Sequence, residues 1–407
     1  MTALARVPAR RIVRALADAA ARWADADFPP RVRTLEAIVA RVGYTVPVVE
    51  YALDRLFCSI TEAGIEATIV DELGSLAALD GFVERGGRPR GYARPIGSVC
   101  VVSSRTTIGV AIVPAVFALS AKCDVLVKDR EDGLVRAFFS SLHEELDEFR
   151  EAARAQNWRG DSEAIDLGAF DAVVAFGSDA TLARIAEGVA APATFVGYGS
   201  RASIGYVARE ALCDESAART IAEGAARDLV LYETEGCLSL HALFVEAGGV
   251  VDPQRFSTLL AAAVERAAVE FPPGERDARA SARIASARNL AAFRAAGGSG
   301  SVFSDERASY LAVLDPPVSE PPAFLPRALG IRTVDGPASA LAYVRRHGIA
   351  IEAIAVAGRR DDIQRLAVDL GAHRLTPFGS LQNPPIGGNH GGRPRVAEFV
   401  RWIGSEV

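Results

Sequence analysis

The sequence predicts an α/β protein in which helices cover parallel sheets and a helical region comes first. Three observations lead to this fold class. From about residue 96 onward, short apolar segments alternate with amphipathic segments, which is the pattern of βαβ units. Before that point, apolar residues recur at helical spacing. The length of 407 residues, 50% of them hydrophobic, allows two domains with a substantial core.

The N-terminal region is predicted to be helical scaffold. Ile12, Leu16 and Trp23 fall on one face of a helix, and residues 35–42 repeat the pattern after the break at Pro29-Pro30. No pattern of catalytic residues occurs in this part of the chain.

Two blocks of strands and helices follow. The first comprises strands at 96–103, 124–128, 171–176 and 192–196 and helices at 110–120, 136–155 and 180–187. The second comprises helices at 217–231, 256–271, 280–296 and 338–347, strands at 243–246, 310–314 and 351–356, and a last helical turn at 396–403. We therefore expect a first domain at 1–205, optionally joined by the tail 380–407, and a second domain at 206–379.

Composition argues against several function classes. The formal net charge of −6 does not suit a nucleic-acid surface. No apolar run approaches the ~20 residues that span a bilayer. The 5 cysteines show no CxxC spacing and the 5 histidines do not cluster with them, so we expect neither a metal site nor a disulfide framework. Scattered thiols are typical of a reducing cytoplasm, where we expect this protein.

Cys237 is the strongest candidate for chemistry. It lies in Glu235-Gly236-Cys237-Leu238-Ser239, between a predicted helix and an apolar strand. A thiol at such a junction can be supported by main-chain N–H groups and reached by substrate, as a thioester-forming nucleophile requires. His241, four residues on, shares a strand face with Cys237 at even spacing. It either lines the site or is a satisfied core histidine.

The first block contains candidate cofactor-binding residues. Lysine occurs only at positions 122 and 128, and Lys128 ends a predicted strand, where parallel sheets bind ligands. Arg130 suits a 2′-phosphate, whereas Glu131 suits a 2′-hydroxyl, so the two point to different cofactors. Gly177-Ser178-Asp179 turns the chain from a strand into a helix, whose N-terminus can bind phosphate. Asp179 fits a helix cap as well as a ligand site.

These motifs, taken in order, resemble the aldehyde dehydrogenase superfamily. The Cys237 segment, Gly197-Tyr198-Gly199-Ser200 and the C-terminal Gly391-Gly392-Arg393-Pro394-Arg395 most resemble the long-chain acyl-CoA reductases, a family that includes the reductase of bacterial luminescence. The resemblance covers the chain from about residue 90 onward. It implies an aldehyde-dehydrogenase-like fold with two Rossmann-like lobes.

The resemblance also implies a reaction. Cys237 attacks an acyl-CoA, or another acyl-carrier thioester, and a reduced nicotinamide cofactor (NADPH, with NADH left open) converts the acyl-enzyme to an aldehyde. Lys128 is implied at the adenosine ribose, and Gly177 with Ser178 at the pyrophosphate. A homo-oligomer, either dimer or tetramer, is expected by resemblance, with an acyl-activating enzyme as an optional partner.

The sequence departs from the superfamily at three places. The segment 195–199 lacks the carboxylate that activates water in aldehyde dehydrogenases, which favours acyl reduction over oxidation to an acid. The neighbourhood of the oxyanion-stabilising asparagine reads Ser104-Arg105-Thr106-Thr107, so either Thr106 or Arg105 substitutes for the amide or the enzyme is slow or inactive. Glu235 stands where glutamine is usual, and its charge can raise the thiol pKa unless an arginine pairs with it. The alternatives are a catalytically silent acyl- or dinucleotide-binding homologue and an aldehyde dehydrogenase running in the oxidative direction.

Overall fold

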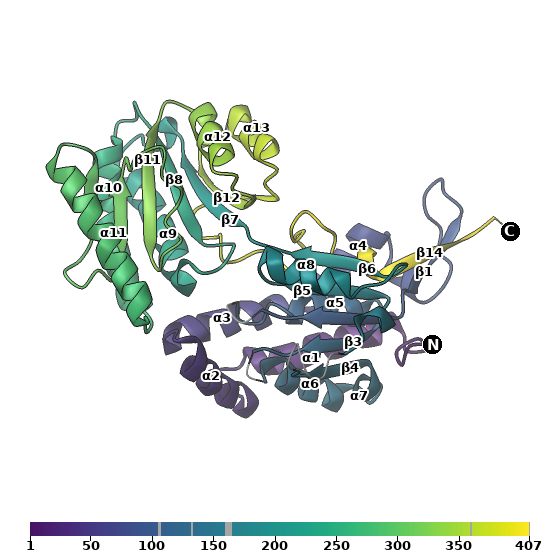
Figure 1. The fold of residues 1–407 in the computed structure, drawn as a ribbon. Helices are drawn as coiled ribbons and strands as arrows, with labels where there is room; N and C mark the ends of the chain where they lie inside the picture. The colour runs from purple at the N-terminus through teal and green to yellow at the C-terminus, as the bar shows by residue number, and fades with distance from the viewer. Residues whose placement is uncertain (105–106, 132, 159–164, 359, 407) are drawn as a thin grey trace. The chain divides into compact units, whose positions relative to one another are not determined.

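A computed structural model describes residues 1–104, 107–131, 133–158, 165–358 and 360–406 (Figure 1). The chain forms two compact units. The first unit contains Met1–Val42, Val49–Ser200 and Pro385–Val407, and the second contains Gly43–Val48 and Arg201–Pro384. The tail therefore belongs to the first unit from residue 385 onward, and residues 201–205 belong to the second.

A five-stranded parallel sheet forms the centre of the first unit, in the order β4-β3-β2-β5-β6. Its strands are β2 (Ser98–Val102), β3 (Asp124–Lys128), β4 (Ala153–Gln156), β5 (Ala172–Phe176) and β6 (Thr194–Tyr198). The chain runs outward from β2 to β4 and then returns to β5 on the other side of β2. This reversal between β2 and β5 is the place where α/β sheets bind ligands, at the carboxyl ends of the strands.

Helices cover this sheet, and a separate two-stranded ribbon pairs β1 (Arg90–Pro95) with β14 (Val400–Ser405). The helices are α1 (Ala9–Ala24), α2 (Pro29–Val42), α3 (Val46–Ser59), α4 (Glu62–Leu73), α5 (Ile112–Ser120), α6 (Leu134–Glu145), α7 (Phe149–Ala152) and α8 (Asp179–Glu187). In α1 the predicted apolar face is buried, and Trp23 donates from Nε1 to Ser141 Oγ on α6 at 2.9 Å. Lys122 is buried and pairs with Asp80 at 2.6 Å, so one of the two lysines stabilises the fold.

The second unit is built on a seven-stranded sheet in the order β13-β12-β7-β8-β11-β10-β9, parallel except at β9. Its strands are β7 (Ala202–Val207), β8 (Leu240–Glu246), β9 (Ser301–Phe303), β10 (Leu311–Leu314), β11 (Ala328–Val334), β12 (Ile351–Ala357) and β13 (Arg374–Thr376). Its helices are α9 (Glu215–Val230), α10 (Pro253–Glu270), α11 (Ala278–Ala296), α12 (Pro337–Arg346) and α13 (Asp361–Leu370). Helices α12 and α13 pack against β7, β8 and β12 through one apolar core.

Most of the predicted elements are present, but the structure corrects three. The predicted helix at 136–155 ends at Glu145, and its last residues form β4, because pairing with β3 overrides the helical preference of Ala-Arg-Ala-Gln. The predicted helical turn at 396–403 is confirmed only as the 3-10 helix Ala397–Phe399, and the rest of it is β14, whose partner β1 lies some 300 residues earlier in the chain. Strand β7 was not predicted, although all its residues are buried.

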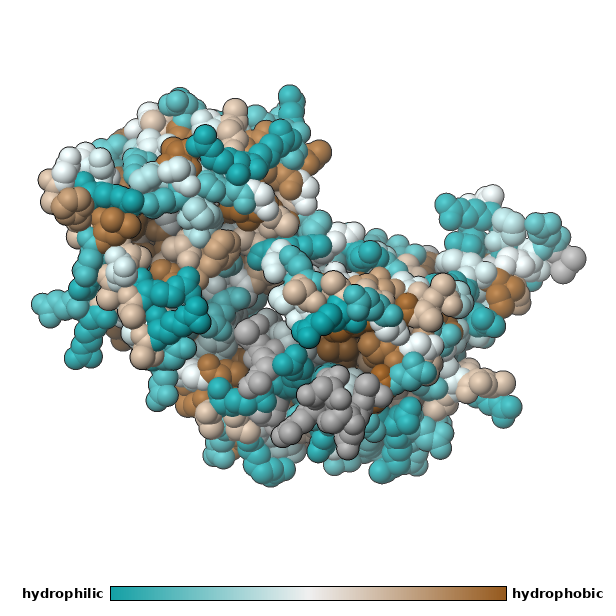
Figure 2. All heavy atoms as spheres, in the orientation of Figure 1, coloured by the Kyte–Doolittle hydropathy of each residue, from teal (hydrophilic) through white to brown (hydrophobic). Residues whose placement is uncertain are grey.

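None of the described helices is long and apolar enough to cross a membrane. The face shown in Figure 2 mixes hydrophilic and hydrophobic residues over both units.

Gly224 allows α9 to approach the segment that precedes the tail. A Cβ there would lie 2.7 Å from the main-chain carbon of Phe378, so Gly224→Ala forces backbone apart. We expect this substitution to lower the free energy of unfolding by about 1–3 kcal/mol. Gly336→Ala is the matched control, because its φ of 175° is extended and no atom lies within 4 Å of the added methyl. Urea unfolding followed by circular dichroism measures both, and equal effects would contradict the close approach.

Candidate active site

Cys237 lies in a short turn that connects the 3-10 helix Leu231–Thr234 to β8. Its side chain is only partly exposed. Ser203, on the neighbouring strand β7, donates from Oγ to the carbonyl of Cys237 at 2.8 Å. Ser239 N donates to the carbonyl of Gly236 at 3.0 Å and closes the turn. The main chain on both sides of the thiol is therefore fixed by hydrogen bonds.

The residues that precede this turn adopt a left-handed conformation. Tyr232, Glu233 and Thr234 have φ values of 57°, 51° and 61°. For residues other than glycine, the left-handed region costs about 1–2 kcal/mol each. A run of such residues persists only where the surroundings hold it in place, and strain of this kind concentrates at functional sites.

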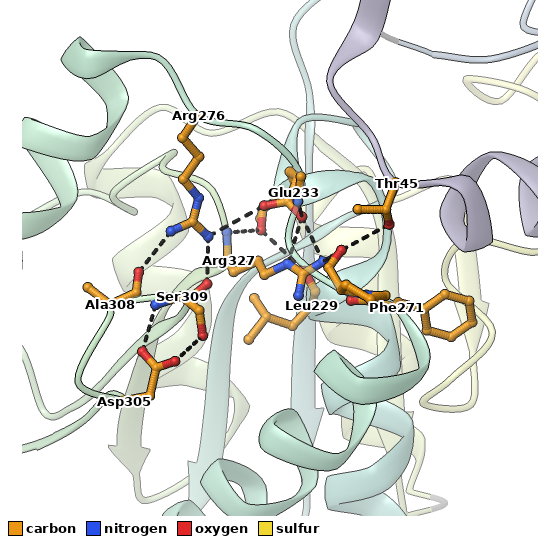
Figure 3. A network of polar contacts seen from close by, with 12 residues as sticks. Thr45, Leu229, Glu233, Phe271, Arg276, Asp305, Ala308, Ser309 and Arg327 are labelled. Carbon is orange, nitrogen blue, oxygen red and sulfur yellow. Dashed lines mark hydrogen bonds and ion pairs between the residues drawn. The ribbon is translucent and has the colours of Figure 1, made fainter. Parts of the chain in front are cut away.

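A buried ion pair holds the left-handed turn (Figure 3). The Oε1 atom of Glu233 accepts a hydrogen bond from Arg327 Nε at 2.8 Å and forms an ion pair with Nη2 at 2.7 Å, and both residues are buried. Arg327 N also donates to Thr234 Oγ1 at 2.9 Å. Arg327 Nη2 reaches the carbonyl of Phe271 at 2.9 Å, so the turn is joined to the end of α10.

Arg276 extends this network to a neighbouring loop. It approaches Glu233 Oε2 at 3.5 Å and donates to the carbonyls of Ala308 at 2.8 Å and Ser309 at 2.5 Å. Gly274 N donates to Glu233 Oε1 at 3.2 Å. Glu233 is thus the common acceptor for segments that lie before β8, after α10 and before β11.

The resting thiol is protonated at neutral pH. Burial raises the pKa of the Cys237 thiol to about 11, and the charge of Glu352 on β12 adds to the rise. Arg201 and the main-chain N–H groups of Cys237 and Leu238 act in the opposite direction. The carboxylate found to act on the thiol is thus Glu352 and not the predicted Glu235, which accepts a hydrogen bond from Tyr44 Oη at 3.1 Å.

A charged cluster lies at the amino ends of β7, β12 and β13, the same edge at which Cys237 precedes β8. Arg201 Nη1 donates to Glu352 Oε2 at 2.8 Å and approaches His373 Nδ1 at 3.0 Å. Arg374, next to His373, is the first residue of β13. No local pattern in the sequence distinguishes these residues. Each is a charged or titratable side chain at the amino end of an apolar strand, and this much is visible in the sequence. The strand order β13-β12-β7-β8, which brings them together, is not visible there.

His241 is buried on β8 at 4% exposure, and burial lowers the pKa of its imidazole to about 4, so it is neutral at pH 7. Its ring lies 5.0 Å from that of Phe324. Its Nδ1 atom has no hydrogen-bond partner among the described residues. His241 is therefore a neutral, buried side chain of β8, and its predicted place in the site stays a prediction.

The candidate cofactor residues lie in the first unit. Lys128 ends β3 and pairs in register with Val102 of β2, which pairs with Ala175 of β5. Lys128 Nζ lies 4.8 Å from the centre of the Trp158 ring. Burial and the charge of Arg130 lower the pKa of Lys128. Strands are ~4.8 Å apart, so Lys128 and the end of β5 are separated by roughly 10 Å along one sheet edge.

Ser178 caps α8, with its Oγ accepting from Thr181 N at 3.4 Å. It is exposed, and so is the first turn of the helix. Asp179 is not the cap. Its Oδ1 accepts from Ser200 N at 2.9 Å and holds the end of β6. A Cβ on Gly177 would make only ordinary contacts, with Thr181. Lys128 and the helix N-terminus at Gly177-Ser178 thus place a positive charge and the positive end of a helix dipole at the carboxyl edge of one sheet.

Two further predictions concern neighbouring segments. Thr106, predicted as an oxyanion donor, lies outside the described residues, as does Arg105. The segment 195–199, where a water-activating carboxylate would stand, instead contributes Tyr198. Its ring stacks on those of Phe176 at 4.9 Å and His390 at 4.1 Å, and the Phe176 and His390 rings lie 5.7 Å apart, so the three rings form one cluster.

Comparison with known protein families decides the identity. A model of the acyl-CoA reductase (LuxC) family matches residues 4–402, which include both units. The chain belongs to this family. It is therefore an oxidoreductase that acts on acyl or aldehyde groups, and the resemblance seen in the motifs is confirmed. Curated protein sequences give no significant match.

Solved structures of aldehyde dehydrogenases share the fold of this acyl-CoA reductase family member. A NAD-dependent benzaldehyde dehydrogenase from Corynebacterium glutamicum matches with a TM-score of 0.70 at 15% identity, over 99% of this chain and 87% of that one. Glyceraldehyde-3-phosphate dehydrogenase GapN from Methanocaldococcus jannaschii, solved with NADP, matches with a TM-score of 0.68 at 9% identity, over 98% and 90%. A Thermus 1-pyrroline-5-carboxylate dehydrogenase with bound NAD matches with a TM-score of 0.65 at 15% identity, over 97% and 81%. The predicted aldehyde-dehydrogenase-like fold is confirmed.

Arg327→Met removes one partner of the buried pair and leaves the charge of Glu233 without its main counterion. We expect it to lower the free energy of unfolding by about 3–5 kcal/mol. Arg266→Met removes an exposed ion pair with Glu223, of 3.1 Å, and should cost less than about 1 kcal/mol. Urea unfolding compares the two variants. A loss for Arg327→Met no larger than for Arg266→Met would show that the pair does not hold the turn.

Proposed function

We propose that this chain is an NADPH-dependent reductase that converts an acyl thioester, carried on coenzyme A or an acyl carrier, to an aldehyde through an acyl-enzyme on Cys237. The observation that carries the proposal is the setting of Cys237. It is partly exposed and follows a strained turn held by a buried ion pair, and main-chain N–H groups favour its thiolate. Cys100 and Cys123, by contrast, are buried in the first unit, where burial raises the pKa of each to about 12.

In the proposed reaction, the Cys237 thiolate attacks the thioester carbonyl carbon, and the carbonyl electrons move to oxygen. The oxyanion then collapses, the carbon–sulfur bond to the carrier breaks, and the carrier leaves as a thiol after taking a proton from solvent. The main-chain N–H groups of Cys237 and Leu238 favour the negative charge on the Cys237 sulfur from which the attack begins. A bound reduced nicotinamide supplies the hydride that releases the acyl group as an aldehyde.

The carboxylates of the second unit favour reduction over hydrolysis. Hydrolysis of an acyl-enzyme needs a base that accepts a proton from water. Glu352 is the carboxylate that acts on Cys237, but its Oε2 accepts from Arg201 at 2.8 Å. A carboxylate paired with an arginine is a weak base. The acyl-enzyme is therefore expected to persist until hydride reaches it.

The residues after β3 favour NADPH over NADH. Glu131 is buried and accepts a hydrogen bond from Gly109 N, and burial raises the pKa of its carboxyl to about 8. Its Oε1 atom has no hydrogen-bond partner among the described residues, but the whole side chain is buried, which disfavours a contact with a ribose 2′-hydroxyl. Arg130 is only half-buried and remains the residue that suits a 2′-phosphate. Solved enzymes of this fold carry NAD or NADP, which supports a nicotinamide dinucleotide here.

The proposal includes a cytoplasmic, bacterial, homo-oligomeric enzyme, either a dimer or a tetramer, that receives its substrate from an acyl-activating reaction. Light scattering of the purified chain tests the oligomeric state, and a monomer at all concentrations would remove that part of the proposal.

Cys237→Ala should abolish both the acyl adduct and the reduction. Incubation with a panel of acyl thioesters, followed by intact-mass spectrometry and by nicotinamide absorbance, measures the two effects. Cys58→Ala is the control, because that thiol is exposed on α3 and should be dispensable. Dinucleotide binding with no adduct on any thioester would indicate a silent homologue. Formation of acid from aldehyde and NAD would indicate the oxidative reaction.

Lys128→Ala and Arg130→Ala should distinguish binding of the adenosine ribose, which both cofactors share, from binding of the 2′-phosphate, which only NADPH carries. Loss of a charged hydrogen-bond donor costs about 1.5–3 kcal/mol. We expect Lys128→Ala to weaken NADPH and NADH about equally, by tenfold or more, and Arg130→Ala to weaken NADPH alone. Nucleotide fluorescence titration measures binding without turnover. Equal loss of both nucleotides in Arg130→Ala would contradict the assigned specificity.

A further inference from the structure

The guanidinium of Arg374 forms hydrogen bonds through only one of its three nitrogens among the described residues. Arg374 begins β13 and pairs in register with Ala353 of β12. Its Nη2 atom donates to the carbonyls of Ser380 at 3.1 Å and Leu381 at 2.5 Å. Its Nε and Nη1 atoms are buried and have no hydrogen-bond partner among the described residues. Buried donors are almost always satisfied in native proteins, so a pair of them on one guanidinium calls for an acceptor.

Other buried arginines do not share this feature to the same degree. Arg276, Arg327 and Arg332 each leave one buried nitrogen without a partner, whereas Arg374 leaves two. Burial lowers the pKa of Arg374, and the negative charges of Asp228, Glu352 and an ionised Cys237 work against that. Glu352 also acts on the Cys237 thiol, so the guanidinium and the thiol share a charged neighbour at the amino edge of the sheet.

A chain of hydrogen bonds joins Arg374 to the Cys237 turn. Arg374 binds the carbonyls at 380–381, and Asp228 on α9 anchors the same segment by accepting from Gly379 N at 2.7 Å and Leu381 N at 3.0 Å. The next residue, Gln382, donates from Nε2 to Ser239 Oγ at 2.9 Å. Ser239 N in turn donates to the Gly236 carbonyl. Arg374 and the turn that carries Cys237 thus belong to one hydrogen-bond network.

We propose that Arg374 is a catalytic residue whose two unpartnered nitrogens, Nε and Nη1, bind the negative charge that forms at Cys237. The charge lies first on the sulfur, after the thiol proton passes to solvent. In the acyl transfer, which rests on the proposed function, it moves to the carbonyl oxygen as the new carbon–sulfur bond forms, and it leaves with the carrier thiolate. Arg374 then supplies the stabilisation for which the family's asparagine is missing from Ser104-Arg105-Thr106-Thr107.

Alkylation of Cys237 tests the first part without any substrate. Near pH 9 the rate is proportional to the thiolate fraction. Arg374→Gln should lower the rate of reaction with iodoacetamide at pH 9 about tenfold, since a positive charge beside the thiol is lost. The two charges that act on the thiol, Glu352 and Arg201, stay in place, as do Asp228 near Arg374, His373 beside Arg201, and Glu235 and His241 near Cys237 in the chain. Peptide mass spectrometry resolves the sites, and exposed Cys58 and Cys213 should keep their rates. An unchanged rate at Cys237 overturns the proposal.

Arg374→Lys separates charge from hydrogen bonding. It keeps the charge, so alkylation at pH 9 should stay within about twofold of the original, but it loses the fork of donors, so acylation by a thioester should fall about tenfold or more. Arg332→Gln, a buried arginine that binds loop carbonyls and the Tyr343 hydroxyl, is the control and should change neither rate. If Arg374→Gln does not fold, an unchanged acylation rate in Arg374→Lys overturns the proposal. If the unmutated chain accepts no thioester, the proposed function fails, and the alkylation comparison still decides the role of Arg374 at the thiol.

Discussion

The buried pair between Glu233 and Arg327 is the interaction on which the arrangement of the second unit's site depends. Three left-handed residues lead into the Cys237 turn, and such a run is unfavourable in isolation. The pair offsets this, because one carboxylate oxygen binds two guanidinium nitrogens while the main chain of Arg327 binds Thr234. A lysine cannot reproduce this geometry, since it has no planar fork of donors. The buried ion pair thus fixes the main-chain direction of residues 232–234, which lead to Cys237.

This constraint fixes position but not reactivity. The sulfur sits in a region where burial and Glu352 favour the neutral thiol, whereas Arg201, two main-chain N–H groups and, in our proposal, Arg374 favour the thiolate. The balance leaves the thiol protonated at rest, which protects it from adventitious oxidation, since the thiolate is the reactive form. When a ligand binds and excludes water, the electrostatic attraction between the cationic groups and the Cys237 thiolate becomes stronger.

The sequence predicted the parts of the fold that local pattern determines. Alternation gave β3 with the same bounds as observed, and the helix predicted at 217–231 is observed as α9, which Asp214 caps. The pairing of β1 with β14 and the edge strand β4 depend on contacts between distant segments, so local pattern misled there. Cys237, Lys128 and the Gly177-Ser178 turn could be found because each carries a local signature, and their catalytic and cofactor roles remain predictions. Arg374, Glu352 and the Glu233–Arg327 pair could not be found, because strand order brings Arg374 and Glu352 to the edge where Cys237 lies and brings Arg327 to Glu233.

A single-turnover chase tests most directly whether this turn presents a nucleophile that waits for hydride. The enzyme is loaded with an acyl thioester, freed from excess substrate, and divided between buffer alone and buffer with NADPH. Mass spectrometry should show an acyl group on Cys237 that persists in buffer and disappears with NADPH as one equivalent of aldehyde forms. An adduct that is lost as free acid at the same rate in both samples, or no adduct on Cys237 at all, would contradict the account.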